Sequence, residues 1–163
     1  MLDNTYQQPE RPKNWQTVLK PGHIVMFRFP VRLTENPPKI RPCLVLDVVR
    51  RDGKLFAVLA YGTTAQTNAN RGYEVAVSGE TLLKVLKLRK PTRFVGARRI
   101  TVSLDHHGFA CNRDGTPILS ELVGTSVDRM HAVRARIHAM ADIRKERREA
   151  RACRRKPKQL SLF

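Results

Sequence analysis

The sequence has few acidic residues, few cysteines and no long hydrophobic run. Its 163 residues include 14 Asp and Glu against 31 Lys and Arg, which gives a net charge of +17, far more than solubility requires. Cys43, Cys111 and Cys153 are odd in number and lack CxxC spacing, so we expect neither a disulfide framework nor a zinc site. The apolar runs 43–49 and 55–60 are too short to span a membrane, and no membrane segment is expected.

These shortages narrow the class of protein. A chain of this length forms one domain of ordinary size plus tails. With sparse cysteines and no secretory signal ahead of them, we expect a reducing, cytoplasmic environment. The positive charge predicts a polyanionic partner, above all nucleic acid, while a merely solvated basic surface is the alternative. Residues 144–158 alone hold nine Lys or Arg and two Glu.

Hydrophobic periods and turn signals predict a mainly β domain. Residues 23–29 alternate polar and apolar side chains, as a half-buried strand does. Segments 42–50 and 54–61 flank an Asp-Gly dipeptide, which is a strong hairpin signal, so they should pair antiparallel. Residues 81–88 fit a strand or a short helix by period alone. Further strands are expected at 73–78, at 94–104 with a bend at Gly96, and in a closing hairpin within 105–122.

A helix is predicted to follow the β domain. Thr125 and Asp128 form a start that resembles a capping box, and apolar residues then recur at helical spacing. This stripe predicts that the helix packs on the barrel, and beyond it we expect an extension into solvent to about Arg151, before Pro157. The stripe consists of Val127, Met130, Val133, Ile137, Met140 and Ile143. The predicted organisation is a loose arm over 1–20, the domain over 21–143, and a basic helical extension and tail over 144–163.

Polar residues stand at the ends of the two hairpin strands. Arg41 immediately precedes the first strand, and Thr63 and Thr64 immediately follow the second. Antiparallel pairing brings the start of one strand beside the end of the other, so Arg41 and Thr63 should share a cleft. A guanidinium forks onto phosphate oxygens and a hydroxyl adds a donor or acceptor, which suits a phosphodiester. The alternatives are an Arg41–Glu35 ion pair and turn capping by the threonines.

The segments KIRPCLVLDVV (39–49) and GTTAQTNANRGYEVAVSG (62–79) resemble the MazF/PemK family of toxin ribonucleases. The likeness runs more loosely from about residue 21 to about residue 143. It implies a small SH3-like antiparallel barrel with a C-terminal α-helix, and it favours a strand over 81–88. It further implies a homodimer that cleaves single-stranded RNA without a metal or other cofactor, through 2′-OH attack that leaves a 2′,3′-cyclic phosphate. An antitoxin with an acidic, disordered segment would be its partner.

The resemblance also implies residue roles. Arg41 would stabilise the phosphate and assist proton transfer, and Thr63 would position the same group. Charge stabilisation suits Arg41 better, because the pKa of arginine stays above about 12. Glu35 would act as base or orient Arg41, with a solvated loop carboxylate as the alternative. The expected RNA-binding residues are Thr64, Lys39, Lys87, Arg89, Lys90 and Arg93.

The sequence departs from the family at the segment before Pro91. Some members carry an Arg-x-Asp pair there, whereas this chain has Lys87 and places Arg89 where the acid would stand. A non-catalytic nucleic-acid-binding module is therefore the alternative function. His106-His107 is the best candidate metal pair, but no carboxylate or cysteine cluster accompanies it, so no metal site is predicted.

The last five residues, QLSLF (159–163), resemble the short peptide by which bacterial proteins bind the DNA sliding clamp. A glutamine followed by spaced apolar side chains suits a groove that takes a few anchors. The alternative is that this end folds back onto the barrel. In the alternative function, the peptide recruits the binding module to the replication clamp. The residues concerned are Gln159, Leu160, Leu162 and Phe163.

Overall fold

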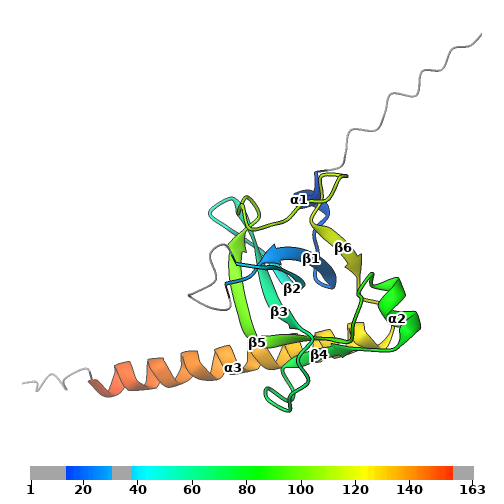
Figure 1. Cartoon of the computed structure of the whole chain (residues 1–163). Coiled ribbons are helices and arrows are strands. Elements are labelled where there is room, and N and C mark those ends of the chain that lie inside the picture. The colour runs from blue at the N-terminus through cyan, green and yellow to red at the C-terminus, as the bar shows by residue number, and fades with distance from the viewer. Residues whose placement is uncertain (1–13, 31–37, 156–163) are drawn as a thin grey trace, which may run out of the picture.

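Six antiparallel strands form one curled sheet, and a long helix crosses its outside (Figure 1). This computed structural model describes residues 14–30 and 38–155. The strand order is β4-β5-β3-β2-β1-β6, so the sheet is a half-barrel with β4 and β6 at its edges. The predicted mainly β fold with a C-terminal helix is confirmed. The elements are α1 (Trp15–Val18), β1 (His23–Arg28), β2 (Ile40–Arg51), β3 (Lys54–Thr63), β4 (Glu74–Val77), α2 (Glu80–Val85), β5 (Thr92–Ser103), β6 (Ile118–Glu121) and α3 (Thr125–Arg155).

The β2–β3 hairpin is the centre of the sheet and confirms the prediction from Asp-Gly. Asp52 and Gly53 both have positive φ, 50° and 76°, as the two central residues of a type I′ turn require. The register pairs Cys43 with Tyr61 and is interrupted once, near Asp47. The turn therefore sets the register as far as Asp47, and the shift there sets which residues pair at the far end of the hairpin.

A bulge bends β5 at the predicted position. Ala60 pairs with Arg99, but the next residue, Tyr61, pairs with Val95, so the three residues between them on β5 have no partner on β3. A side chain at Gly96 would place its Cβ 2.8 Å from Cγ1 of Val133 and 2.9 Å from a backbone oxygen. Only glycine lets α3 lie this close to the bent strand.

Apolar side chains cover both faces of the sheet, because successive residues of a strand point to opposite sides. The face of the first cluster carries α1 and the segment before β6, and that of the second carries α2 and α3. Burial of each large side chain contributes about 1.5–3 kcal/mol. The first cluster includes Phe27, Val45, Leu59, Tyr61, Val102 and Phe109, and the second includes Ile24, Leu44, Phe94, Leu86, Met130 and Val133.

Residues 81–85 belong to the helix α2 and 86–87 to a turn, where the family resemblance favoured a strand over 81–88, so that prediction was wrong. Leu82, Leu83 and Leu86 all face the second cluster, which a helical spacing permits and a strand spacing does not. An i,i+4 ion pair of 3.1 Å joins Lys84 to Glu80 on the exposed side. The hydrophobic period of this segment did not distinguish a helix from a strand, and the packing of the three leucines in the core selects the helix.

The long helix α3 begins at Thr125, as predicted, and extends to Arg155 rather than to about Arg151. Met130 and Val133 are buried, but Ile143 is 39% exposed, so its predicted packing on the barrel was wrong. The outer part of the helix projects beyond the sheet (Figure 1). Within residues 14–30 and 38–155, no helix has both the length and the apolar character needed to cross a bilayer.

One buried histidine links this fold to pH. His23 is 8% exposed, its Nδ1 accepts the backbone N–H of Lys20 at 3.2 Å, and its Nε2 lies 3.8 Å from Oε2 of Glu121. Burial lowers the pKa of His23 below its ordinary 6.5, although the Glu121 carboxylate pulls the other way. His23 is therefore harder to protonate in the folded protein than in the unfolded chain.

We predict that the free energy of unfolding decreases as the pH falls below about 6.5, since the pKa of His23 is lower in the folded state. Replacement His23→Asn keeps an acceptor at the δ position and should flatten this dependence. Urea unfolding between about pH 7.5 and about pH 5.5 measures it. The exposed His107 serves as control, and His107→Asn should retain the wild-type slope. An unchanged slope in His23→Asn would contradict the assignment.

Candidate functional site

Arg41 and Thr63 lie on one face of two neighbouring strands. Cys43 pairs with Tyr61, and Arg41 and Thr63 each lie two residues further along their strand, so the alternation of side chains puts both on the same face of the sheet. Gly62 lets the strands approach, because a Cβ there would lie 2.0 Å from the carbonyl oxygen of Pro42. The structure thus brings together the two residues predicted to act on a phosphate.

A second guanidinium, which the sequence argument did not include, joins this site. The Cζ atom of Arg41 lies 5.6 Å from the ring centroid of Tyr61, and that of Arg98 lies 5.4 Å from the same centroid. Arg98 belongs to the bulged part of β5, and bulges commonly re-aim a side chain. The bend predicted at Gly96 was the available signal for it. Two cations that share one aromatic ring form a favourable place for an anion.

The hydroxyl of Thr63 is held by its own loop. Its Oγ1 accepts the backbone N–H of Ala65 at 3.1 Å, so Thr63 does cap the turn, as the alternative proposed. In this cap the Thr63 oxygen only accepts a hydrogen bond. The hydroxyl also has one hydrogen that it can donate. The cap therefore fixes the position of the oxygen, and the hydroxyl hydrogen can still be donated to an anionic ligand. Thr64, the next residue, is exposed.

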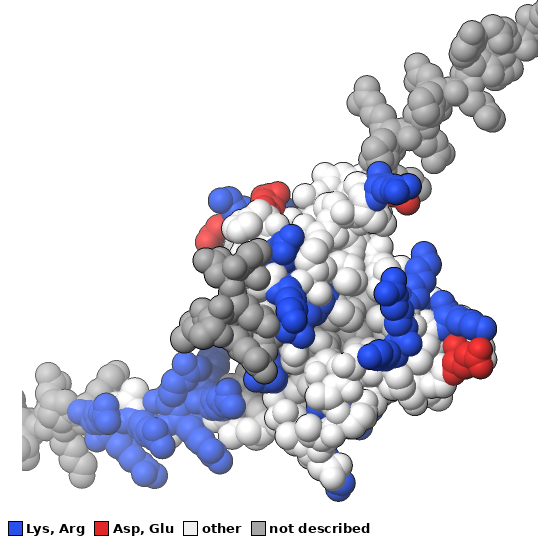
Figure 2. All heavy atoms as spheres, viewed as in Figure 1, with Lys and Arg blue, Asp and Glu red and all other residues white. Residues whose placement is uncertain are grey.

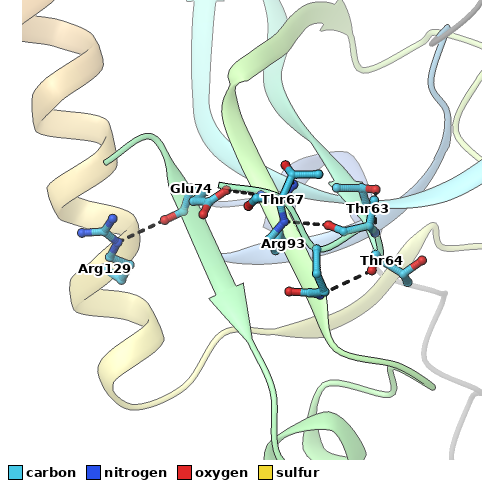
Figure 3. A network of polar contacts seen from close by, with 8 residues as sticks. Thr63, Thr64, Thr67, Glu74, Arg93 and Arg129 are labelled. Carbon is cyan, nitrogen blue, oxygen red and sulfur yellow. Dashed lines mark hydrogen bonds and ion pairs between the residues drawn. The ribbon is translucent and has the colours of Figure 1, made fainter. Parts of the chain in front are cut away.

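Arg93 holds the loop that follows Thr63 from within (Figure 3). Its side chain is 7% exposed, and it donates to the carbonyl oxygens of Ala65 and Thr67, both at 2.8 Å, and to Thr67 Oγ1 at 3.1 Å. It also forms a 2.7 Å ion pair with Oε2 of Glu74. Arg93 was expected on an RNA-binding surface, but the structure places it below that surface as a positioning residue.

The ion pair connects the loop to the long helix. Arg129 on α3 donates from Nε to the backbone oxygen of Glu74 at 3.0 Å (Figure 3). Sequence reasoning missed both Glu74 and Arg129. Their partners are 19 and 55 residues away, and no local period connects them.

Four of the six predicted RNA-binding residues line one cleft of about 500 Å³. They are Thr64, Lys87, Arg89 and Lys90, beside Pro42 and apolar side chains that include Met26 and Leu119. Lys39 is exposed ahead of β2 and does not line the cleft. In Figure 2, a group of cations covers the region of α2, next to a largely uncharged surface.

The cleft and the Arg41–Thr63 pair meet at the end of the hairpin from opposite faces. Side chains alternate along a strand, so Pro42 points to the face of the second apolar cluster and Arg41 to that of the first. Met26 pairs with Pro42 across β1 and β2, which places it at the same strand end. An extended ligand that crosses this end therefore contacts both groups.

Other predicted residues fall elsewhere. Glu35 and the terminal residues Gln159, Leu160, Leu162 and Phe163 lie outside the described residues. The rings of His106 and His107 stack at 4.8 Å, and Nδ1 of His106 accepts the N–H of Gly108. In the described part of the chain, no three His, Cys, Asp or Glu side chains gather in a way that could hold a metal ion.

Cys43 is placed beside the site but is chemically inert there. Its side chain is fully buried, and burial raises the pKa of the thiol to about 12. The thiolate needed for nucleophilic attack is therefore absent near neutral pH. Cys43 serves as a small apolar residue under the hairpin end.

Comparison of the sequence with models of known protein families and with curated proteins found no match. The argument for function therefore depends on the geometry of the site and on the motif resemblance.

We predict that Arg93→Met destabilises the protein by about 3 kcal/mol, because it leaves the carboxylate of Glu74 without its buried partner. The loop over 64–67 should also become sensitive to limited proteolysis, since three of its acceptors lose their donor. Urea unfolding gives the free energy. Arg89→Met is the matched control at an exposed position and should cost less than about 0.5 kcal/mol. Equal costs for the two variants would contradict the positioning role of Arg93.

Proposed function

We propose that this protein is a metal-independent endoribonuclease of the MazF/PemK type that cleaves single-stranded RNA through 2′-OH attack. One observation carries the proposal: Arg41 and Thr63 lie on the same face of two neighbouring strands, each two residues beyond the Cys43–Tyr61 pair. The motif resemblance assigns these two residues to the phosphate. Their shared position supports that assignment, because both must reach the same phosphorus atom.

In the proposed reaction, the 2′-oxygen loses its proton and attacks the adjacent phosphorus. Negative charge then collects on the phosphate oxygens, where the Arg41 guanidinium stabilises it and the Thr63 hydroxyl donates a hydrogen bond. Arg98 adds a second positive charge near the same ring. The 5′-oxygen leaves with a proton supplied by solvent, and the products are a 2′,3′-cyclic phosphate and a 5′-hydroxyl end. Glu35 is the proposed base.

In this proposal, the cleft beside Pro42 holds the phosphates that flank the cleaved bond. Lys87, Arg89 and Lys90 line it with Thr64, which gives three cations within one hollow. An RNA strand that leaves the Arg41–Thr63 pair crosses the hairpin end and enters this cleft. An acidic antitoxin segment would compete for the same cations, and a cytoplasmic homodimer belongs to the same proposal.

A non-catalytic nucleic-acid-binding module is the second candidate. Arg89 lines the cleft at the position where some members of the resembled family carry an acid. A third cation in place of that acid increases attraction for phosphates while removing a group that could transfer protons. In this alternative the same surface binds RNA and leaves it intact, and the sliding-clamp peptide would recruit the module.

We predict that Arg41→Gln lowers the cleavage rate by a factor of about 10² to 10³, because it removes the donor that stabilises the transition-state charge. Arg41→Lys keeps the charge but loses the fork, and it should fall between Gln and wild type. The assay incubates mixed RNA with protein in EDTA and maps the new ends. Arg51→Gln, which changes the same charge in the hairpin turn, is the control and should cleave normally.

The same experiment separates the two candidates. Wild-type protein that binds RNA in a salt-dependent way and leaves every strand intact would refute the nuclease and support the module. Cleavage that persists in Arg41→Gln would show that the site lies elsewhere. Circular dichroism of each variant confirms that a lost activity does not reflect lost structure.

A further inference from the structure

The outer part of α3 projects beyond the half-barrel (Figure 1). Every residue from 141 to 155 is exposed, although the helix is continuous from Thr125 to Arg155. This part contains seven cations, three carboxylates and no aromatic residue. Ala141 and Arg144 still line a hollow with Tyr73 and Arg99 of the barrel, but a helix whose residues are all exposed gains little stability from burial, so its side chains invite a functional explanation.

The charges of this projecting part are separated onto opposite faces. At about 100° per residue, the acidic positions 142, 146 and 149 fall on one side of the helix. Six arginines fall on the other, and four of them, Arg144, Arg147, Arg148 and Arg151, line one shallow surface hollow. We call this surface the arginine face; its residues are Arg144, Arg147, Arg148, Arg151, Arg154 and Arg155.

This arrangement opposes the stability of an isolated helix. Like charges at i,i+3 and i,i+4, such as Arg144 with Arg148 and Arg151 with Arg155, cost about 0.2–0.5 kcal/mol per pair. Among the described residues, no carboxylate forms an ion pair with any of the six arginines. A helix selected only for solubility would interleave the two signs. The arginine face therefore matches an external polyanion.

Two features favour duplex DNA as that polyanion. Sequence-tolerant binding of single strands combines cations with aromatic stacking platforms, and residues 141–155 have none. The arginine face is about 16 Å long, and a helix fits the major groove of B-DNA, which is about 12 Å wide and bordered by phosphates on both sides. The acidic side of the helix would then point out of the groove, away from the phosphates. In the deep, narrow major groove of A-form RNA, it would be enclosed with them.

We propose that the arginine face of α3 binds the phosphate backbone of duplex DNA, without selecting a base sequence. The site contains neither Arg41 nor Thr63 and does not depend on the proposed RNA cleavage. A protein that never cuts RNA still presents this surface.

The test compares two full-length variants that lose the same charge. The first carries Arg144→Gln, Arg148→Gln and Arg151→Gln on the arginine face, where glutamine preserves helix propensity. The control carries Arg51→Gln, Lys54→Gln and Arg113→Gln, three exposed cations of the barrel loops. Fluorescence anisotropy with a labelled 20-base-pair duplex of random sequence, at several salt concentrations, gives the affinity and its salt dependence.

We expect the first variant to bind the duplex at least about 10-fold more weakly at 0.15 M salt, with a log–log salt slope reduced by about 3, since three phosphate contacts are lost. The control should lose less than about 3-fold. Equal losses in both variants would overturn the proposal, because only net charge would then matter. A loss seen with single-stranded RNA or polyglutamate, and not with the duplex, would overturn it in favour of another partner.

Discussion

The buried ion pair between Arg93 and Glu74 holds the candidate site together. The Arg93 side chain is 7% exposed and that of Glu74 16%, so both charges have left water and each needs the other. Such a pair contributes little net stability over two apolar residues, but removal of either partner leaves an expensive charge behind. The role of the ion pair here is to hold neighbouring segments in position. Through Arg93 it fixes the loop after β3, and through Glu74 it contacts Arg129 on α3.

Close backbone approach is the second constraint on the site. Gly62 brings β3 against the carbonyl of Pro42, and Gly96 brings the bent β5 against α3. The first contact holds the strand ends that carry Arg41 and Thr63 together, and the second accompanies the bulge that carries Arg98 to Tyr61. Two glycines at strand positions thus shape the part of the sheet that carries these three side chains. A Cβ at Gly62 would push β3 away from Pro42, and a Cβ at Gly96 would push β5 away from α3.

Short sequence patterns correctly predicted the features that depend on neighbouring residues, such as turns. The Asp-Gly turn requires two residues with positive φ, so it predicted the hairpin whose neighbouring strands carry Arg41 and Thr63. Residues 81–88 were ambiguous because three leucines suit either period, and only the second apolar cluster selects the helix. Arg93 could not be recognised as buried, since its acceptors lie up to 28 residues away. The predicted packing of Ile143 was wrong because a helical period shows which residues share a face but not how far the sheet extends beneath that face.

The cleft beside Pro42 and the arginine face are two groups of cations that share no residue. Along α3, Arg129 contacts the loop network, while Arg148 stands 19 residues further on, at a distance of about 28 Å along the helix axis. The Debye length at physiological salt is about 8 Å, so the charge of Arg148 is screened from that of Arg129. Nearer the barrel, Arg144 lines a hollow with Arg99 of β5, so the arginine face begins beside the sheet. In the two proposals above, RNA at the cleft and duplex DNA at the arginine face would each bind with its own salt dependence.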